Sequence, residues 1–293
     1  MRMQIRLDSA LLALFCVVLL APAIGAGPEE KITLEQLLER HRATLGISPQ
    51  DNATATRALR GITRAVAIVG PAMRLTGTVE LASQGRKFNF RMRLDNSKYP
   101  GERFVFNGQE SYVDYTDVGI RSRLGSFLHH QDQILKSGLF GGILTTGWPL
   151  AGPVPEGIKV EYEGLKKKDD RKLHQVRYRI PKGGGDTEIR LFFEPETFRH
   201  VLTEYRVSIN PSIGITETAS AQQQVARTIL EEEFSSFQTV QGLNLPARWR
   251  IRYTTEGGAT ISATASTITE WQVIFQGVDV DLPVDPALFT WKR

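Results

Sequence analysis

A strand–turn–strand pattern across residues 186–209, DTEIRLFFEPETFRHVLTEYRVSI, constrains this chain more than any other feature. Ile189, Leu191 and Phe193 fall on one face of an extended segment, and the following Glu-Pro-Glu-Thr places Pro195 at the second position of a turn. On the returning strand, one face is expected to carry Val201, Tyr205, Val207 and Ile209. A hairpin with one apolar face requires a partner layer over that face.

The same alternation recurs through most of the sequence. Three successive strands are expected in residues 62–68, 73–81 and 88–94, and the Asn107-Gly108 turn predicts a further hairpin within residues 104–115. We therefore expect a mainly β fold of the α+β class, with one large curved antiparallel sheet and a few helices over its apolar face. Later strands are expected around residues 160–162, 176–180, 229–237, 249–253 and 271–275, and a short helix or loop in residues 49–60.

Two segments replace this alternation with helical spacing. Thr33 precedes Gln36 at the spacing of a capping box, and a leucine stripe follows up to Gly46. A second helix is expected to cross the sheet within residues 122–150, and glycines near its far end favour a mobile lid. A helix simply packed on the sheet explains the same glycines, because glycine also ends helices. The expected contact face of this helix is Phe127, Leu128, Ile134 and Leu135.

Residues 1–26 have the pattern of a cleaved secretory signal peptide. Arg2 and Arg6 precede an apolar run over residues 11–20, which is too short to span a bilayer comfortably, and small residues follow. Cys16, the only cysteine, lies inside this run after Phe15, so we expect neither lipid anchoring there nor a disulfide in the exported chain. Residues 27–293 are expected to form a single periplasmic domain, with a turn at residues 285–289 that plugs one end.

The sequence contains no motif that supports catalysis. It has no Gly-x-Ser-x-Gly elbow, Walker loop or His-Glu-x-x-His, and its formal net charge of +4 is nearly neutral for 293 residues. Nucleic-acid binding is therefore not expected, because it requires a concentrated basic face. His129 and His130 are adjacent, so their side chains diverge on a helix, and no third ligand is spaced to complete a metal site. We expect no enzyme, no cofactor and no metal.

The inward-facing apolar residues of the expected sheet have two interpretations. They line a ligand cavity, or they form a dry core of the kind common in half-buried sheets. A wide sheet with few covering helices tends to leave either a cavity or an exposed apolar patch, and such patches usually bind something. The candidate cavity residues on strands are Phe88, Phe90, Met92, Phe104, Phe106, Val176, Tyr178, Leu191, Phe193, Tyr205, Trp249 and Ile251.

Arginines alternate with apolar residues on two of the expected strands. Arg248, Arg250 and Arg252 point away from Trp249 and Ile251, and Arg91 and Arg93 alternate similarly with Phe90 and Met92. A solvated outer face that deters edge pairing is one interpretation. An electrostatic surface for anionic lipid or an acidic partner is the other.

In the order of its elements, the chain resembles the LolA and LolB superfamily of lipoprotein carrier and sorting proteins. The resemblance covers most of the exported chain and rests on the leading helix TLEQLLERH, the strands in GTVELASQGRKFNFRMRLDN, the FVFNGQESYV hairpin, the mid-chain helix, the LFFEPETFRHVLTEYRV hairpin and the closing DPALF. It implies an unclosed antiparallel half-barrel, with helices across its mouth and an apolar concavity that holds acyl chains. The Pro-x-x-Phe-Arg-Trp pattern around the arginine that latches the lid in carriers is absent.

This resemblance implies two classes of function. In the first, the protein shields the acyl chain of a lipid or lipoprotein and carries or sorts it in the cell envelope, with a membrane or envelope protein as a further partner. In the second, it is a non-transporting sensor or interaction module, similar to the amino-terminal domain of RseB. A lipid that copurifies in the absence of detergent distinguishes the first class from the second.

Overall fold

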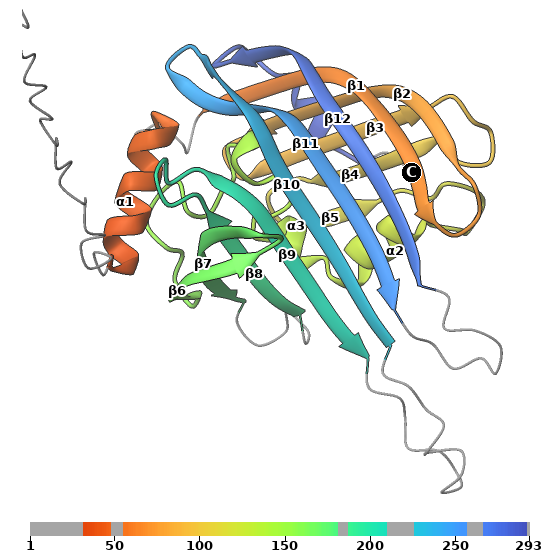
Figure 1. Cartoon of the computed structure of the whole chain (residues 1–293). Helices are drawn as coiled ribbons and strands as arrows, with labels where there is room; N and C mark the ends of the chain where they lie inside the picture. Colours follow the sequence, from red (N-terminus) through yellow and green to blue (C-terminus); the bar gives the residue numbers. More distant parts are fainter. Residues whose placement is uncertain (1–31, 48–54, 181–186, 210–225, 257–265, 292–293) are drawn as a thin grey trace, which may run out of the picture. The chain divides into compact units, whose positions relative to one another are not determined.

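The computed structural model describes residues 32–47, 55–180, 187–209, 226–256 and 266–291. The strands within these residues form one antiparallel sheet of twelve, in the order β5-β4-β3-β2-β1-β12-β11-β10-β9-β8-β7-β6 (Figure 1). β5 and β6 are its edges and do not pair with each other, which confirms the expected unclosed half-barrel. The strands are β1 Thr56–Val69, β2 Arg74–Gln84, β3 Lys87–Leu94, β4 Gly101–Phe106, β5 Ser111–Val113, β6 Lys159–Lys168, β7 Arg171–Arg179, β8 Thr187–Phe193, β9 His200–Ile209, β10 Ala226–Val240, β11 Leu243–Glu256 and β12 Thr267–Val280.

The alternation read from the sequence places the strands correctly, with one correction near the start of the sheet. Residues 56–60 begin β1 and do not form the expected helix or loop, whereas residues 48–54 lie outside the described residues. The reason is that Arg57 and Leu59 already alternate inward, and both are buried. Further along β1, a Cβ atom at Gly61 would lie only 2.1 Å from the carbonyl oxygen of Ile274, so glycine is required where β12 approaches.

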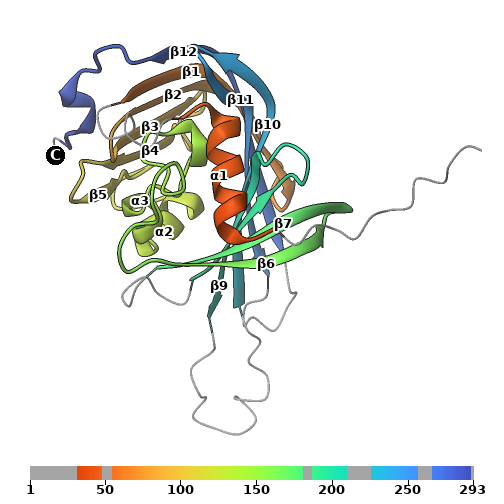
Figure 2. The same cartoon turned by 90° about the vertical axis from the view of Figure 1, so that its left-hand side faces the viewer.

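Helix α1, Leu34–Leu45, has the expected capping box between Thr33 and Gln36. It ends at Gly46, which adopts the left-handed conformation with φ 70°. A Cβ atom at Gly46 would lie 2.2 Å from the carbonyl oxygen of Gly242, so the helix end rests directly on the β10–β11 turn. Figure 2 shows α1 across the inner side of the sheet, where Leu37, Leu38 and Leu45 are buried.

The mid-chain helix expected within residues 122–150 is broken into short pieces. These are α2 Arg123–His130, α3 Gln133–Lys136 and the 3-10 turn η1 Gly142–Leu144. Gln131 leaves the helical conformation at φ −108° and ψ 45°, and its side-chain oxygen accepts a hydrogen bond of 2.7 Å from Thr187 on β8. The break allows the segment to follow the curvature of the sheet, which one straight helix would not do.

The carboxyl-terminal tail lies on the outer face of β3 and β4. Asn89 Nδ2 donates a hydrogen bond of 2.6 Å to the carbonyl oxygen of Leu288, and the Arg103 guanidinium lies over the Trp291 ring. Asn89 and Arg103 point away from the core because they alternate with the buried phenylalanines of the same strands. The expectation that residues 285–289, which include η2 Pro286–Phe289, plug one end of the sheet is therefore wrong.

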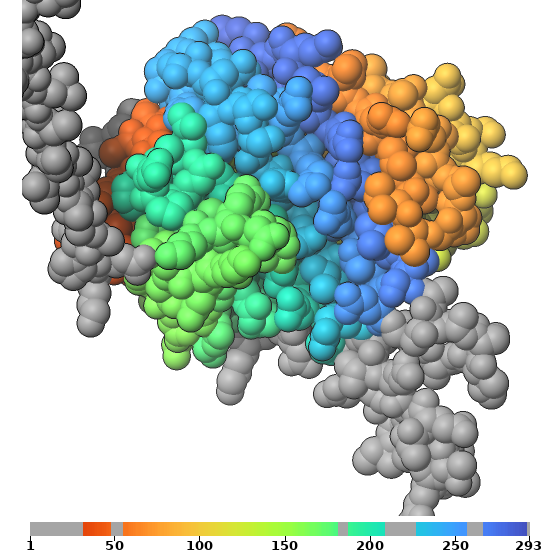
Figure 3. Space-filling view, in the orientation of Figure 1, coloured from red at the N-terminus to blue at the C-terminus, as the bar shows by residue number. Residues whose placement is uncertain are grey.

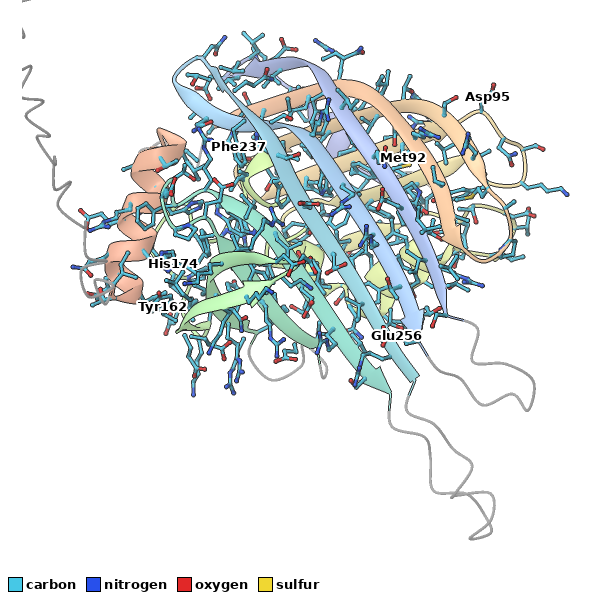
Figure 4. All side chains as sticks on the ribbon, in the orientation of Figure 1. Met92, Asp95, Tyr162, His174, Phe237 and Glu256 are labelled. Atoms are coloured by element: carbon cyan, nitrogen blue, oxygen red, sulfur yellow. The ribbon has the colours of Figure 1, made fainter. Side chains whose placement is uncertain are left out.

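The β6–β7 hairpin covers another part of the outer face. Lys168, at the end of β6, bonds Glu204 at 2.8 Å and Glu231 at 2.9 Å, which lie on β9 and β10. Figure 3 shows the hairpin, in green, in contact with the surface of the later strands. A small apolar cluster lies nearby, and a bulge in the β8–β9 register places Val201 within it, not on the inner face as expected. The cluster contains Leu173, Phe192, Val201 and Leu202, and Phe237, which is labelled in Figure 4, packs against it.

Candidate functional site

All the residues expected to line a cavity are buried in the structure, and none is more than 7 % exposed. The structure brings them together as one layer between the sheet and the helices, where they pack closely. The sheet supplies Phe88, Phe90 and Met92 from β3, Phe104 and Phe106 from β4, Val176 and Tyr178 from β7, Leu191 and Phe193 from β8, Tyr205 from β9, and Trp249 and Ile251 from β11; the helices supply Phe127, Leu128, Ile134 and Leu135.

Phe140 occupies the centre of this layer, although the sequence analysis did not single it out. Its ring stands edge-on to four rings of the sheet, with centroid distances of 5.2 Å to Trp249, 5.5 Å to Phe104, 5.9 Å to Phe90 and 6.1 Å to Phe88. Phe234 stacks on Trp249 from the other side. We call Phe90, Phe104, Phe234 and Trp249 the aromatic floor. Edge-to-face rings at these distances add specific attraction to the burial of apolar area.

The segment that carries Phe140, residues 122–150, is here called the cover segment. None of its residues lies in a strand. Among the described residues, its backbone–backbone hydrogen bonds are made within the segment, apart from one between Trp148 and the adjoining Ala151. The cover segment is therefore held on the sheet by apolar packing and by side-chain hydrogen bonds, and not by a strand ladder.

Arg57 supplies the first of these side-chain bonds. Its Nη1 atom donates to the carbonyl oxygens of Ile143 at 2.8 Å and Thr145 at 3.1 Å. The side chain is buried, and burial lowers the pKa of Arg57 to about 10, so the guanidinium is still charged at neutral pH. A buried charge whose partners are the carbonyls of one loop holds that loop strongly.

Glu232 on β10 holds the same loop from another direction. Its Oε1 accepts a hydrogen bond of 2.7 Å from the backbone N–H of Gly141, and its Oε2 accepts one of 2.7 Å from the Tyr205 hydroxyl. Burial raises the pKa of Glu232 to about 8, so the carboxyl is mostly neutral at pH 7. A neutral carboxyl group fits this apolar site with little desolvation cost.

Glu102 on β4 holds the opposite end of the cover segment. It accepts a hydrogen bond of 2.5 Å from the Tyr99 hydroxyl and bonds the side chain of Ser122, which caps α2 through Gly125. Burial raises the pKa of Glu102 to about 7. Two buried carboxyl groups, one near each end of the cover segment, thus contact its backbone or its capping residue.

A histidine–tryptophan cluster joins the cover segment to α1. Trp148 donates from Nε1 to Nε2 of His41 at 3.1 Å and stacks on His200 at 4.6 Å. His41 Nδ1 lies 2.9 Å from the carbonyl oxygen of Phe198, so Nδ1 carries the proton and Nε2 accepts. Burial lowers the pKa of His41 to about 4 and that of His200 well below its ordinary value, so both rings are neutral.

Arg57, Glu102, Glu232 and Phe140 were missed by the sequence analysis. The sequence does contain one indication of the two glutamates. Glu232 falls on the same inward face of its strand as Leu230 and Phe234, and Glu102 falls on the same face as Phe104. A lone charged residue at an inward position of an apolar strand indicates a buried polar contact. The partner of that contact is not visible in the sequence.

The outward arginines are largely paired with carboxylates. Arg250 bonds Glu233, and Arg252 bonds Glu270 at 3.0 Å, across neighbouring strands. Arg93 lies 3.5 Å from Glu80 in the same way. This pairing neutralises much of the outer face and favours the solvated, aggregation-resistant interpretation over a surface for anionic lipid.

Two further observations concern the described residues as a whole. They contain no group of three or more His, Cys, Asp or Glu side chains arranged to hold a metal ion. Within the same ranges, no helix is both long and apolar enough to cross a membrane.

The geometry can be compared with known proteins at this point. No family model matches the chain, and no curated protein matches it. The chain is similar to the crystal structure of a LolA superfamily protein from Nitrosomonas europaea, which is 14% identical and aligns over 89% of this chain and 98% of the other, with a TM-score of 0.44.

Two more solved structures are similar. One is a domain from Vibrio parahaemolyticus named for outer membrane lipoprotein sorting, which is 6% identical and covers 87% of this chain and 94% of its own, with a TM-score of 0.43. The other is MucB in its complex with the periplasmic part of MucA, which is 8% identical, with coverages of 83% and 94% and a TM-score of 0.20.

Proposed function

We propose that this chain is an exported periplasmic protein that binds the acyl chain of a lipid or lipoprotein between the cover segment and the aromatic floor. In this function it carries or sorts the acyl chain in the cell envelope and performs no chemistry of its own. The bound chain takes the position that Phe140 occupies when the site is closed.

The observation that carries this proposal is the attachment of the cover segment. Arg57, Glu102 and Glu232 bond it through side chains, and no strand ladder has to break when it lifts. Beneath it lies the aromatic floor, a surface that water wets poorly. A removable cover over an apolar, concave surface is the arrangement that a carrier of apolar chains requires.

The energetics couple the opening of the cover segment to the binding of a ligand. Lifting the cover segment without a ligand exposes apolar area at roughly 25 cal/mol per Å² and breaks several buried hydrogen bonds, so the closed state dominates. An acyl chain laid on the aromatic floor restores the lost apolar contact. The ligand therefore shifts the equilibrium by its preference for the open form, and the protein stays closed when it is empty.

Native mass spectrometry of protein exported by a bacterial host and purified without detergent tests the proposal. We expect a copurifying lipid that leaves on mild activation, and amino-terminal sequencing is expected to show a mature chain that begins close to residue 27. A clean apo mass that does not change when palmitoylated lipopeptide is added would contradict the ligand. An intact Met1 or a lipid on Cys16 would contradict the export step.

The alternative, a protein-interaction module, is favoured by one observation on the outer face. Ile62 and Ile274 are direct register partners on β1 and β12, and their side chains are 45% and 40% exposed. An exposed aliphatic pair in the middle of a sheet is a candidate contact for another protein. The apo mass described above, together with an envelope protein that copurifies with wild type but not with Ile62→Asp, would favour this second function.

A further inference from the structure

A pocket of about 760 Å³ lies beside the cover segment and outside the aromatic floor. It is bounded by the β2–β3 turn at Arg86, by α3, by Trp148 and by the end of β7 at Tyr178. We call it the Trp148 pocket. Its volume falls within the 300–1,000 Å³ typical of small-molecule sites. Of the expected cavity residues, Tyr178 lines it, whereas those of the aromatic floor do not.

One wall of the Trp148 pocket is apolar. Trp148, Pro149, Pro153 and Ile158 contribute to it. The Trp148 Nε1 atom already bonds His41. The Thr146 hydroxyl, also in the lining, already donates to the carbonyl oxygen of Gly85 at 2.7 Å. With these polar atoms occupied, this wall offers an occupant mainly van der Waals contact, which suits an unbranched hydrocarbon chain.

One end of the pocket is cationic. Arg86 and Lys136 both line it, and Arg86 Nη2 donates a hydrogen bond of 2.8 Å to the carbonyl oxygen of Lys136. This bond holds the guanidinium against the backbone of Lys136, whose ammonium group pairs with Asp132 at 2.6 Å. Glu156 also lines the pocket, and its negative charge opposes the two cations.

Tyr178 supplies an independent observation at the same end. Its side chain is 1 % exposed, and its hydroxyl has no hydrogen-bond partner among the described residues. Burial raises the pKa of Tyr178, and the positive charge of Arg86 acts against that rise, which places the two groups within electrostatic reach of each other. A buried hydroxyl without a partner is costly unless something else satisfies it.

We propose that the Trp148 pocket binds a long acyl chain that carries an anionic head group, with the chain along the Trp148 wall and the head group between Arg86 and Lys136. This inference rests on the proposed function and specifies the class of ligand. The anion is either the carboxylate of a fatty acid or the phosphate of a lysophospholipid, since a guanidinium forks to both.

The pocket also connects binding to opening. Lys136 and Trp148 belong to the cover segment, whereas Arg86 lies in the β2–β3 turn and Tyr178 on β7. A head group held by both parts contacts the cover before the chain reaches the aromatic floor. The Trp148 pocket is thus the position at which an incoming acyl anion first engages the closed protein.

Isothermal titration of the delipidated full-length mature protein tests this inference with three ligands: palmitate, 1-palmitoyl lysophosphatidic acid and methyl palmitate, each below its aggregation concentration. We expect the anions to bind more tightly than the neutral ester. Arg86→Glu should weaken the binding of the preferred anion about tenfold, and Glu156→Gln should strengthen it about twofold, with methyl palmitate affected by neither. The anion that loses more affinity in Arg86→Glu identifies the source of the head group.

Controls keep the outcomes separate. Arg93→Glu, on the outer face, should leave all three affinities unchanged, and thermal unfolding checks that each variant is folded. If Arg86→Glu fails to fold, Tyr178→Phe takes its place as the test. It removes only the hydroxyl and should weaken the binding of both anions about threefold. Equal affinities for palmitate and its methyl ester, unaltered by either substitution, would overturn the head-group site and leave the proposed function standing. No binding of any ligand by the wild type would remove the proposed function itself.

Discussion

Glu232 accepts a hydrogen bond of 2.7 Å from the backbone N–H of Gly141, so a sheet carboxyl group satisfies the loop that places Phe140 on the aromatic floor. Glu232→Ala should leave that N–H without a partner, remove the carboxyl partner of the Tyr205 hydroxyl, and lower the free energy of unfolding by about 2–3 kcal/mol. Glu232→Gln should cost under about 1 kcal/mol, because an amide both accepts and donates. Denaturant unfolding measures both variants, and equal losses would contradict the hydrogen-bonding role.

The same carboxyl groups predict how stability depends on pH. Burial raises the pKa of Glu102 to about 7 and that of Glu232 to about 8, whereas an unfolded glutamate ionises near 4.5. The unfolded state therefore binds fewer protons between pH 4.5 and 8, and the free energy of unfolding falls as pH rises through this window. We expect a loss on the order of 1–3 kcal/mol between pH 6.5 and 8.5, and Glu102→Gln with Glu232→Gln should flatten the slope.

The buried histidines have the opposite effect on stability: they lower it as pH falls. His41, with a pKa lowered to about 4, and His200 remain neutral in the folded protein while the unfolded state takes up protons below pH 6.5. Stability is therefore lost as pH falls from 6.5 towards 4. Between about pH 4.5 and 6.5 the two effects oppose each other, so stability should be highest within that range and fall on either side of it. A melting temperature that rose steadily from pH 6.5 to 8.5 would contradict the assignment of the carboxyl groups.

Arg57 is expected to control how often the cover segment opens. Arg57→Ala leaves the carbonyl oxygens of Ile143 and Thr145 without their donor, which should cost about 2–4 kcal/mol and accelerate amide exchange within residues 139–146. Arg60→Ala is the matched control, because Arg60 lies on the same strand but makes an exposed ion pair with Asp279. Its effect should stay below about 1 kcal/mol. Equal exchange rates in the two variants would show that Arg57 does not latch the segment.

Much of the fold was predictable from the sequence because its signals are local. The alternation of Ile189, Leu191 and Phe193 fixes a strand and its inner face, and Thr33 with Gln36 fixes the start of α1. The site depends on contacts between distant residues. Arg57 meets carbonyls 86 and 88 residues further along the chain, and no local pattern encodes that meeting.

Contacts between residues distant in sequence also account for the wrong predictions about the tail and the mid-chain helix. The tail at residues 285–289 reads as a turn, but its position on β3 depends on Asn89, which is far away in sequence. The mid-chain segment has helical spacing throughout, yet the curvature of the sheet and the contact from Thr187 break it at Gln131. Tertiary contacts override local propensity at both places.

The two faces of the sheet should respond differently to a negative charge. Phe193 is fully buried against His41, so Phe193→Asp places a charge without a partner in an apolar site and should unfold the protein or cost more than about 4 kcal/mol. Arg250→Asp breaks half-exposed pairs with Glu233 and Glu270 and should cost about 1–2 kcal/mol. Similar melting temperatures for the two variants would mean that the faces are assigned wrongly.

Substitution of Phe140 tests most directly whether a ligand displaces the cover segment. Phe140→Ala removes the ring that fills the space over Trp249 and Phe104, and the cavity should cost about 3–5 kcal/mol without ligand. Phe192→Ala removes an equally buried ring from the outer cluster, so it controls for the loss of core volume.

Phe140→Ala and Phe192→Ala should respond differently to a ligand. Palmitate should slow amide exchange across residues 122–150 and recover part of the stability lost in Phe140→Ala, because the acyl chain fills the vacated space. Phe192→Ala should show the same ligand response as the wild type. Exchange across the cover segment as slow as that of β8 and unchanged by palmitate in every variant would mean that this segment is a fixed part of the core, and the interaction-module function would then be preferred.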